Sequence, residues 1–150
     1  MPDRSELLGV RNFRVFLGKQ EVGFCEVEGL VSELWEHDGK LEDRLRPVVL
    51  RRALGQDKTL FRWRERAAAG SRLPRDVTID LLGPDGREGV NTWVLAGAWP
   101  TRWSGPVLDA GSDAVALEEL ELAYEALLWQ DQPGDRSRSR RRARPKTNHQ

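Results

Sequence analysis

One stretch in the middle of the chain restricts the fold more than any other: residues 76–95, DVTIDLLGPDGREGVNTWVL. Its apolar side chains Val77, Ile79 and Leu81 alternate with polar ones, which is the two-residue period of a strand with one buried face. The GPDG segment that follows predicts a turn, because Pro presets φ and Gly tolerates positive φ. Gly89–Leu95 then has the pattern of a returning strand. The sequence therefore predicts an antiparallel hairpin, and with it a fold built on a sheet.

Shorter strand-like segments occur on the N-terminal side of this hairpin. They are Asn12–Leu17, Val22–Leu30 after a polar connection at 18–21, Val31–His37 with a turn at Asp38-Gly39, and Val48–Leu50. Their apolar residues alternate or form short runs bounded by Gly, Pro or charged residues. Such a series of short strands predicts a mainly β fold, an antiparallel β-barrel or sandwich.

Only residues 57–70, DKTLFRWRERAAAG, have clear helical spacing. Leu60 and Trp63 lie on one apolar stripe, and Asp57 or Thr59 is a suitable cap for the first turn. The arginines beside Trp63 are also consistent with binding to nucleic acid. We interpret Leu60 and Trp63 instead as the residues that pack one flanking helix against the sheet.

The segment Ala114–Trp129, AVALEELELAYEALLW, fits two structures. Strong helix formers fill it, so propensity favours a helix. However, Leu120, Leu122 and Tyr124 alternate with other residues, several of them acidic, as in a strand with one buried face. These arguments from the residues leave helix and strand both open.

The charges of the chain are unevenly distributed, although its formal net charge is zero. Residues 131–150 contain seven basic and two acidic side chains and no Leu, Ile, Val or aromatic residue. Because such a segment cannot bury apolar surface, we expect one domain over residues 1–130 and a disordered, Arg-rich tail over residues 131–150. The tail suggests an alternative function, a module that binds nucleic acid through phosphate contacts. A solvated tail, or one that docks on an acidic surface of its own assembly, fits the same composition.

Few residues suggest covalent chemistry. His37 lies beside Asp38, but no Ser or Cys motif accompanies the pair, so we interpret it as part of a solvated turn. Cys25 is the only cysteine, and its apolar neighbours predict a buried structural thiol. No pattern suggests a catalytic residue, a metal site, a cofactor or a membrane-spanning segment. We therefore expect a non-enzymatic protein that is made in the cytoplasm.

The most unusual stretch is GAWPTRWSGP, residues 97–106, which holds two Trp, two Pro and two Gly. Prolines lack a backbone N–H and stiffen the chain, and glycine permits a turn that a side chain obstructs. Tryptophans can bury large areas against a sheet, a helix or a neighbouring subunit. We therefore expect an architectural or assembly corner, formed by Trp99, Pro100, Arg102, Trp103, Gly105 and Pro106.

This stretch is part of a longer resemblance. WVLAGAWPTRWSGPVLDAGSDAVALEELELAYEAL resembles the C-terminal fingerprint of the inner-tube protein family of contractile tails and contractile injection systems. In that family a strand ends near "AWP", a K/R-W-S/T-GP turn follows, and a strand rich in E-x-L-E-L comes after a polar gap. NFRVFLGKQEVGFCEVEGLVSE resembles the family's opening hairpin, and DKTLFRWRERAAAG resembles its single helix. The matching residues outside the expected corner include Phe24, Glu26, Val27, Gly29, Leu30, Leu60, Trp63, Arg64, Leu108, Ala110, Glu119, Leu120, Glu121, Leu122, Tyr124 and Glu125.

The resemblance spans residues 12–129 and implies a tail-tube-like β-barrel in which Ala114–Trp129 is a strand. It also implies a homo-hexamer whose rings stack into a tube inside a sheath, with baseplate, spike and other tube proteins as partners and with luminal cargo. Such a tube is assembled in the cytoplasm as part of a phage-tail-like particle. One departure concerns residues 41–58, which are shorter than the hairpin that helps join subunits and rings in related tubes. A specialised ring at a tube end is therefore an alternative to the bulk tube.

Overall fold

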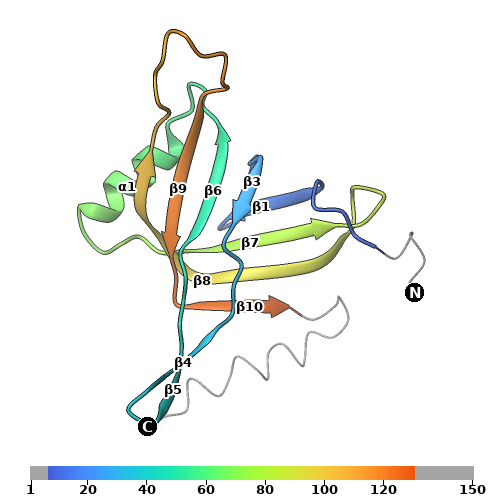
Figure 1. Cartoon of the computed structure of the whole chain (residues 1–150), viewed down its shortest axis with the longest axis vertical. Helices are drawn as coiled ribbons and strands as arrows, with labels where there is room; N and C mark the ends of the chain where they lie inside the picture. Colours follow the sequence, from blue (N-terminus) through green and yellow to red (C-terminus); the bar gives the residue numbers. More distant parts are fainter. Residues whose placement is uncertain (1–6, 131–150) are drawn as a thin grey trace.

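The computed structural model describes residues 7–130, and the Arg-rich segment 131–150 lies outside the described residues. The fold is mainly β with one helix, as the sequence predicts (Figure 1). The elements in chain order are β1 (Phe13–Leu17), β2 (Gln20–Val22), β3 (Glu26–Glu28), β4 (Leu34–His37), β5 (Lys40–Asp43), β6 (Val48–Ala53), α1 (Thr59–Ala68), β7 (Arg75–Leu82), β8 (Gly89–Ser104), β9 (Leu117–Ala123) and β10 (Ala126–Gln130).

Strand β8 joins two sheets, because it is long enough to belong to both. Its first half pairs with β7 and β10, and its second half pairs with β9. The first sheet has the order β2-β1-β7-β8-β10, and the second has the order β8-β9-β6-β3, with antiparallel pairs throughout. In Figure 1 the strands of the first sheet run across the view, whereas β6 and β9 run up it. The two sheets therefore cross at a large angle around one core.

Apolar residues of both sheets fill the space between them. Leu120, Leu122 and Tyr124 of the last segment are buried, as their alternation predicts. The other fully buried side chains of this core include Val15, Val48, Leu50, Val77 and Leu95. Helix α1 covers the side of the core near β8, and its Leu60 and Trp63 are buried as expected. The Trp63 Nε1–H donates to the Leu73 carbonyl at 3.0 Å, which satisfies the one polar atom of that indole.

The predicted strand over residues 22–30 is wrong as a single element. The chain leaves the first sheet after Val22, and β3 pairs with β6 in the second sheet. The expected polar connection over 18–21 is also shorter, because β2 begins at Gln20. Residues 23–25 are the crossing between the sheets, and the Cys25 backbone N–H already donates to the Arg51 carbonyl at 2.8 Å. Because apolar residues continue through the crossing, the sequence pattern does not show that the chain changes its pairing partner there.

The segment 114–129 is extended, so the strand prediction is confirmed against its helical propensity. It is not one strand, however, because β9 ends at Ala123 and β10 begins at Ala126. Between them the Glu125 backbone N–H donates to the Ala96 carbonyl at 2.8 Å. Opposite this break, Gly97 has a φ of +60°, a backbone conformation that glycine adopts at little cost. The chain thus changes from one sheet to the other at Gly97 and Glu125 together.

None of the helices in residues 7–130 has the length and apolar character needed to cross a membrane.

Candidate assembly surfaces

Most of the expected corner at residues 97–106 lies inside strand β8, which ends at Ser104. The prediction that a strand ends near Pro100 is wrong, because β8 continues to Ser104 and pairs with β9. Pro100 is buried, and the register against β9 shifts between Pro100 and Arg102. A proline inside a paired strand removes one ladder donor, and an irregularity at that point is the usual accommodation.

The indole of Trp103 is held from three sides. Its Nε1–H donates to Glu118 Oε1 at 2.8 Å, and the ring of Phe61 on α1 meets it edge-on with centroids 5.0 Å apart. On the third side a Cβ added at Gly105 would lie 3.0 Å from Trp103 Cη2, so glycine lets the chain pass against the ring. The corner therefore fixes β8, β9 and α1 to one another.

Glu118 is the residue that sequence reasoning missed. Its side chain is only 2% exposed, and its Oε2 accepts from Arg52 Nε at 2.7 Å. The Arg52 guanidinium also lies 3.4 Å from the carboxylate of Asp57, which precedes α1. The same carboxylate accepts hydrogen bonds from the Thr59 hydroxyl and the Thr59 backbone N–H. These Thr59 donors lower the pKa of Asp57 from its ordinary value. The signal was present in the sequence, because Glu118 shares its strand face with Leu120 and Leu122.

The remaining corner residues lie nearer the surface. Trp99 is half-buried, and the Arg72 guanidinium lies 4.7 Å from the centroid of its ring. Arg102 is exposed and Pro106 is half-buried. The structure thus brings Trp103 and Gly105 together with Phe61, whereas Arg102 is free to meet another molecule.

A second charged network lies on the outer face of the second sheet. Arg51 on β6 pairs with Glu119 of β9 at 2.8 Å, and with Glu26 and Glu28 of β3 at 2.7 and 2.6 Å. These carboxylates, Glu119 first, raise the pKa of Arg51 from its ordinary value. One guanidinium therefore ties three adjacent strands together.

The residues considered for chemistry are exposed and isolated. His37 lies at the β4–β5 turn, where its Nε2 is 3.4 Å from Asp38 Oδ2 and 76% of its side chain is exposed. The prediction of a solvated turn is confirmed. The prediction of a buried thiol is wrong, because Cys25 lies on the exposed crossing between the sheets. Within residues 7–130, no group of three His, Cys, Asp or Glu side chains is placed to hold a metal ion.

The β4–β5 hairpin is a free-standing projection. All eight residues of its strands are exposed, including Leu34 at 65%, Trp35 at 56% and Leu41 at 68%. Figure 1 shows it extending away from both sheets. At its base, Glu33 accepts from Arg46 Nε at 2.8 Å, and this hydrogen bond lowers the pKa of Glu33. An isolated two-stranded hairpin is marginal in water, so apolar side chains here call for a partner surface.

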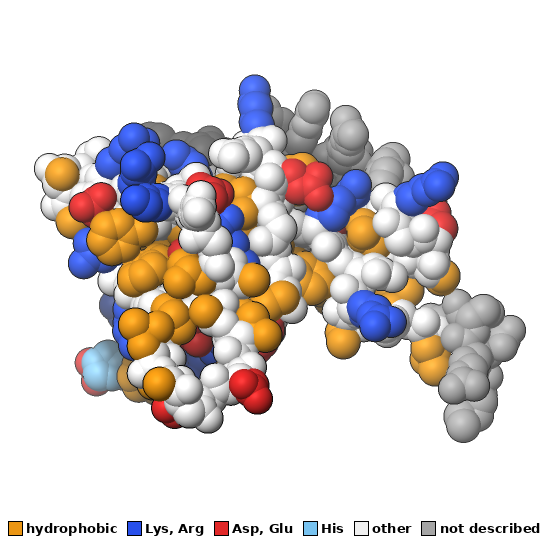
Figure 2. Space-filling model, turned by 90° about the horizontal axis from the view of Figure 1, so that it is seen from above, with side chains coloured by type: hydrophobic (Ala, Val, Ile, Leu, Met, Phe, Trp, Pro, Cys, Tyr) orange, Lys and Arg blue, Asp and Glu red, His pale blue; other side chains and the backbone are white. Residues whose placement is uncertain are grey.

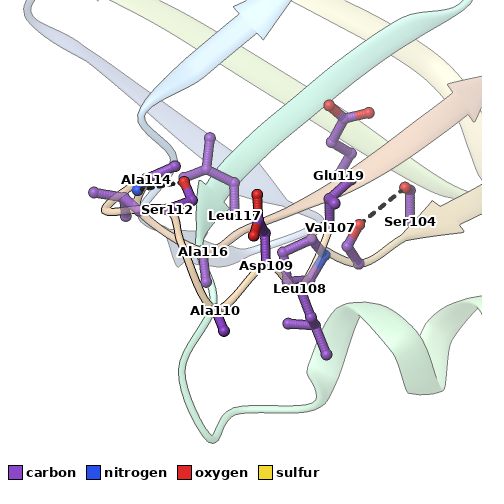
Figure 3. Close-up of a pocket in the computed structure, with 13 residues that line it drawn as sticks. Ser104, Val107, Leu108, Asp109, Ala110, Ser112, Ala114, Ala116, Leu117 and Glu119 are labelled. Atoms are coloured by element: carbon purple, nitrogen blue, oxygen red, sulfur yellow. Dashed lines mark hydrogen bonds between the residues drawn. The ribbon is translucent and has the colours of Figure 1, made fainter.

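The loop between β8 and β9 forms an open groove at the opposite end of the molecule. It encloses about 660 Å³ between Ser104 and Leu117, and its Val107 and Leu108 are 92% and 88% exposed (Figure 3). The Ala114 backbone N–H donates to Ser112 Oγ at 3.1 Å inside this loop. Seen from above, hydrophobic side chains gather beside a group of Lys and Arg side chains (Figure 2). The molecule therefore exposes apolar surface at both ends of its long axis.

Comparisons with known proteins agree on one architecture. A chain from the extended sheath-tube complex of an extracellular contractile injection system, PVC, is 24% identical with a TM-score of 0.65, over 85% of this chain and 93% of that one. A chain from the PVC sheath/tube terminator is 26% identical with a TM-score of 0.64, over 83% and 97%. Hcp1 from Flavobacterium johnsoniae is 11% identical with a TM-score of 0.57, over 78% and 93%. Among curated proteins, no sequence matches the chain.

One protein family matches a continuous stretch of the sequence that holds several of its motifs. The model of the T4-like virus tail tube protein gp19 family matches residues 41–128, from the hairpin strand β5 into β10. This range includes the corner, the helix and nearly all of segment 114–129, which forms strands despite its propensity for a helix. The chain therefore belongs to the T4-like virus tail tube protein family and is a structural tube subunit.

Proposed function

We propose that the protein forms six-membered rings that stack into an inner tube, surrounded by a contractile sheath and attached to a baseplate. The sixfold count is supported by a similar chain in the anti-feeding prophage baseplate, a 6-fold symmetrised structure with a TM-score of 0.57. The tube transmits force and encloses cargo, and its subunits perform no covalent chemistry. Assembly takes place in the cytoplasm, before the particle acts outside the cell.

The observation that carries this proposal is the free-standing β4–β5 hairpin. Residues directly opposite in an antiparallel pair share a face, so Leu34 and Leu41 project to one side and Trp35 to the other. Apolar side chains on both faces of a projecting hairpin suit a slot between other subunits better than a solvent-exposed position. Head-to-tail contacts of this kind close into rings or extend into open stacks.

The sheet edges supply a second source of contacts. Within the described residues, β2 and β3 lie at the two ends of the strand path, and β10 pairs with β8 alone. Unpaired edges are aggregation sites in a monomer but become subunit contacts in a ring. The corner residues Trp103 and Arg102 belong to the same proposal, Trp103 by holding the subunit's shape and Arg102 as an exposed contact.

A specialised ring at a tube end is the second candidate within this proposal. Two of the similar structures are a tube terminating cap of the anti-feeding prophage, with a TM-score of 0.68, and the PVC sheath/tube terminator. The β4–β5 hairpin has only four residues in each strand, which limits its reach toward a further ring. An end ring needs contacts on one side only.

Electron microscopy and sedimentation velocity of the purified protein test the proposal. We expect rings at high concentration, and stacks when rings of the bulk tube protein are added as a template. The double variant Leu34→Ser, Leu41→Ser should fold with an unchanged melting temperature, because both side chains are exposed, and should lose assembly. A wild-type protein that stays monomeric under both conditions contradicts the proposal. Stacks that form without any template contradict the end-ring version.

A further inference from the structure

Helix α1 carries a line of basic side chains that have no acidic partner. Arg62 and Arg66 are exposed on the helix, Lys58 precedes it at the same spacing, and no carboxylate of the described residues pairs with any of the three. The only acidic residue within the helix is Glu65. Five other arginines are paired: Arg14, Arg44, Arg46, Arg51 and Arg52 all lie within 4.0 Å of a carboxylate. The helix surface is thus one part of the fold where several neighbouring cations have no carboxylate partner within the described residues.

The spacing of these cations defines a strip. Residues four apart in a helix lie on one side and about 6 Å apart along the axis, so Lys58, Arg62 and Arg66 form a row. Phe61 lies beside the row and is 41% exposed although its ring contacts Trp103. We call this set the helix strip. It offers positive charge on one edge and the exposed part of the Phe61 ring on the other, with the exposed Glu65 between them.

One face of the β4–β5 hairpin has the opposite character. The pairs Leu34–Asp43 and Glu36–Leu41 are directly opposite in the register, so all four side chains project to the same side. Both carboxylates are exposed, and neither pairs with a basic residue of the described chain. We call these four residues the acidic hairpin face. It presents two carboxylates and two leucines and has no cation.

We propose that the acidic hairpin face of one copy docks on the helix strip of a neighbouring copy. Glu36 and Asp43 are diagonal neighbours on the hairpin, about 7–8 Å apart, which is close to the spacing of successive cations on the helix. The leucines then meet Phe61, and the charges at the edges set the register. In Figure 1 the hairpin and α1 lie at separate places on the molecule. The contact is therefore heterologous: the first copy keeps an unused strip and the second an unused hairpin, so further copies can add at either end.

This inference rests on the proposed tube function and adds the surface that receives the hairpin. The test uses two charge-reversed versions of the full chain. The helix variant is Arg62→Glu, Arg66→Glu, and the hairpin variant is Glu36→Lys, Asp43→Lys. A control, Arg11→Glu, Arg87→Glu, has the same charge change as the helix variant at exposed, unpaired positions away from α1. Circular dichroism and melting temperature check that all four proteins are folded.

We expect each variant alone to remain monomeric in sedimentation velocity, while the control assembles like the wild type. A one-to-one mixture of the two variants should assemble, because each reversed hairpin then meets a reversed helix and each native hairpin meets a native helix. Assembly of the helix variant alone overturns the contact, as does failure of the mixture or loss of assembly in the control. Salt-sensitive binding of single-stranded DNA that only the helix variant loses also overturns it, in favour of nucleic acid as occupant. If the wild type itself never assembles, the proposed tube function fails first.

Discussion

The Nε1–H of Trp103 lies 2.8 Å from Oε1 of Glu118, whose other oxygen accepts from Arg52 Nε at 2.7 Å. A carboxylate that is almost completely buried is stable only with such partners. The hydrogen bond from β8 and the ion pair from β6 share one side chain on β9. Phenylalanine at this position would leave Glu118 without that donor.

Trp103→Phe should lower the free energy of unfolding by about 1.5–3 kcal/mol, because it removes the donor to a buried charged group. Trp129→Phe is the matched control, since the Trp129 Nε1–H donates to Asn91 at 3.3 Å on the exposed face of β10. The control should change stability by less than about 0.5 kcal/mol. Chemical denaturation measures both, and equal effects would show that Glu118 does not depend on Trp103.

Gly29→Ala should destabilise the protein by about 2 kcal/mol or more. Gly29 has a φ of +109°, and a Cβ there would lie 2.5 Å from the Pro47 carbonyl oxygen, which is backbone and cannot rotate away. Gly23→Ala, where a Cβ meets nothing within 4 Å, should be nearly neutral. Thermal melting of the two variants decides the matter, and a stable Gly29→Ala protein would mean that β3 approaches β6 differently.

Leu122→Asp should unfold the protein or cost more than about 4 kcal/mol, because it places a charge in the core between the two sheets. The neighbouring change Glu121→Gln should be almost silent, since that side chain projects to the outer face, where its contact is the Thr101 hydroxyl at 3.4 Å. Far-UV circular dichroism and denaturation distinguish the two. Similar losses at both positions would contradict the strand periodicity of β9.

Tyr124→Phe should cost about 1 kcal/mol near neutral pH, because the Tyr124 hydroxyl donates to the Arg46 carbonyl at the base of the hairpin. Burial raises the pKa of Tyr124 above its ordinary value of 10.0. A raised folded-state pKa gives stability that is complete below the unfolded pKa and is lost as pH rises through the folded pKa. The stability difference between wild type and variant should therefore shrink above about pH 10. A constant difference up to pH 11 would contradict this assignment.

The local sequence pattern was sufficient to predict the elements whose buried residues recur at the period of a helix or a strand. The 76–95 hairpin and the 57–70 helix have apolar residues at the spacing of one buried face. The helix forms as Thr59–Ala68 and the hairpin as β7 and β8, although Leu82 rather than the predicted Leu81 is buried and β8 continues to Ser104. The two-residue period also placed Leu120, Leu122 and Tyr124 in the core before helix and strand could be separated. Pattern alone did not exclude a helix, because leucine, glutamate and alanine favour one and a strand is chosen only when neighbouring strands supply its hydrogen bonds.

The pattern of apolar residues did not predict where a segment changes from one pairing strand to another. Residues 22–30 and 114–129 each look like one strand, yet each divides between two sheets, at 23–25 and at 124–125. The apolar neighbours of Cys25 predict a buried thiol, but on the crossing Phe24 packs against the core and Cys25 is exposed. Local sequence records which faces are apolar and does not record which strand is hydrogen-bonded to which.

The sequence by itself determined the two-residue periods, the single helical segment and the motifs that mark a tube subunit, since these depend on neighbours along the chain. Only the tertiary structure decided that β8 continues through Pro100, that Arg52 and Trp103 are the partners of Glu118, and that the β4–β5 hairpin projects free of both sheets. The physical reason is that buried charges and shared strands are stabilised by residues far apart in the sequence, such as Arg52 and Glu118, which are 66 positions apart. Such partners meet only when the sheets close around a common core.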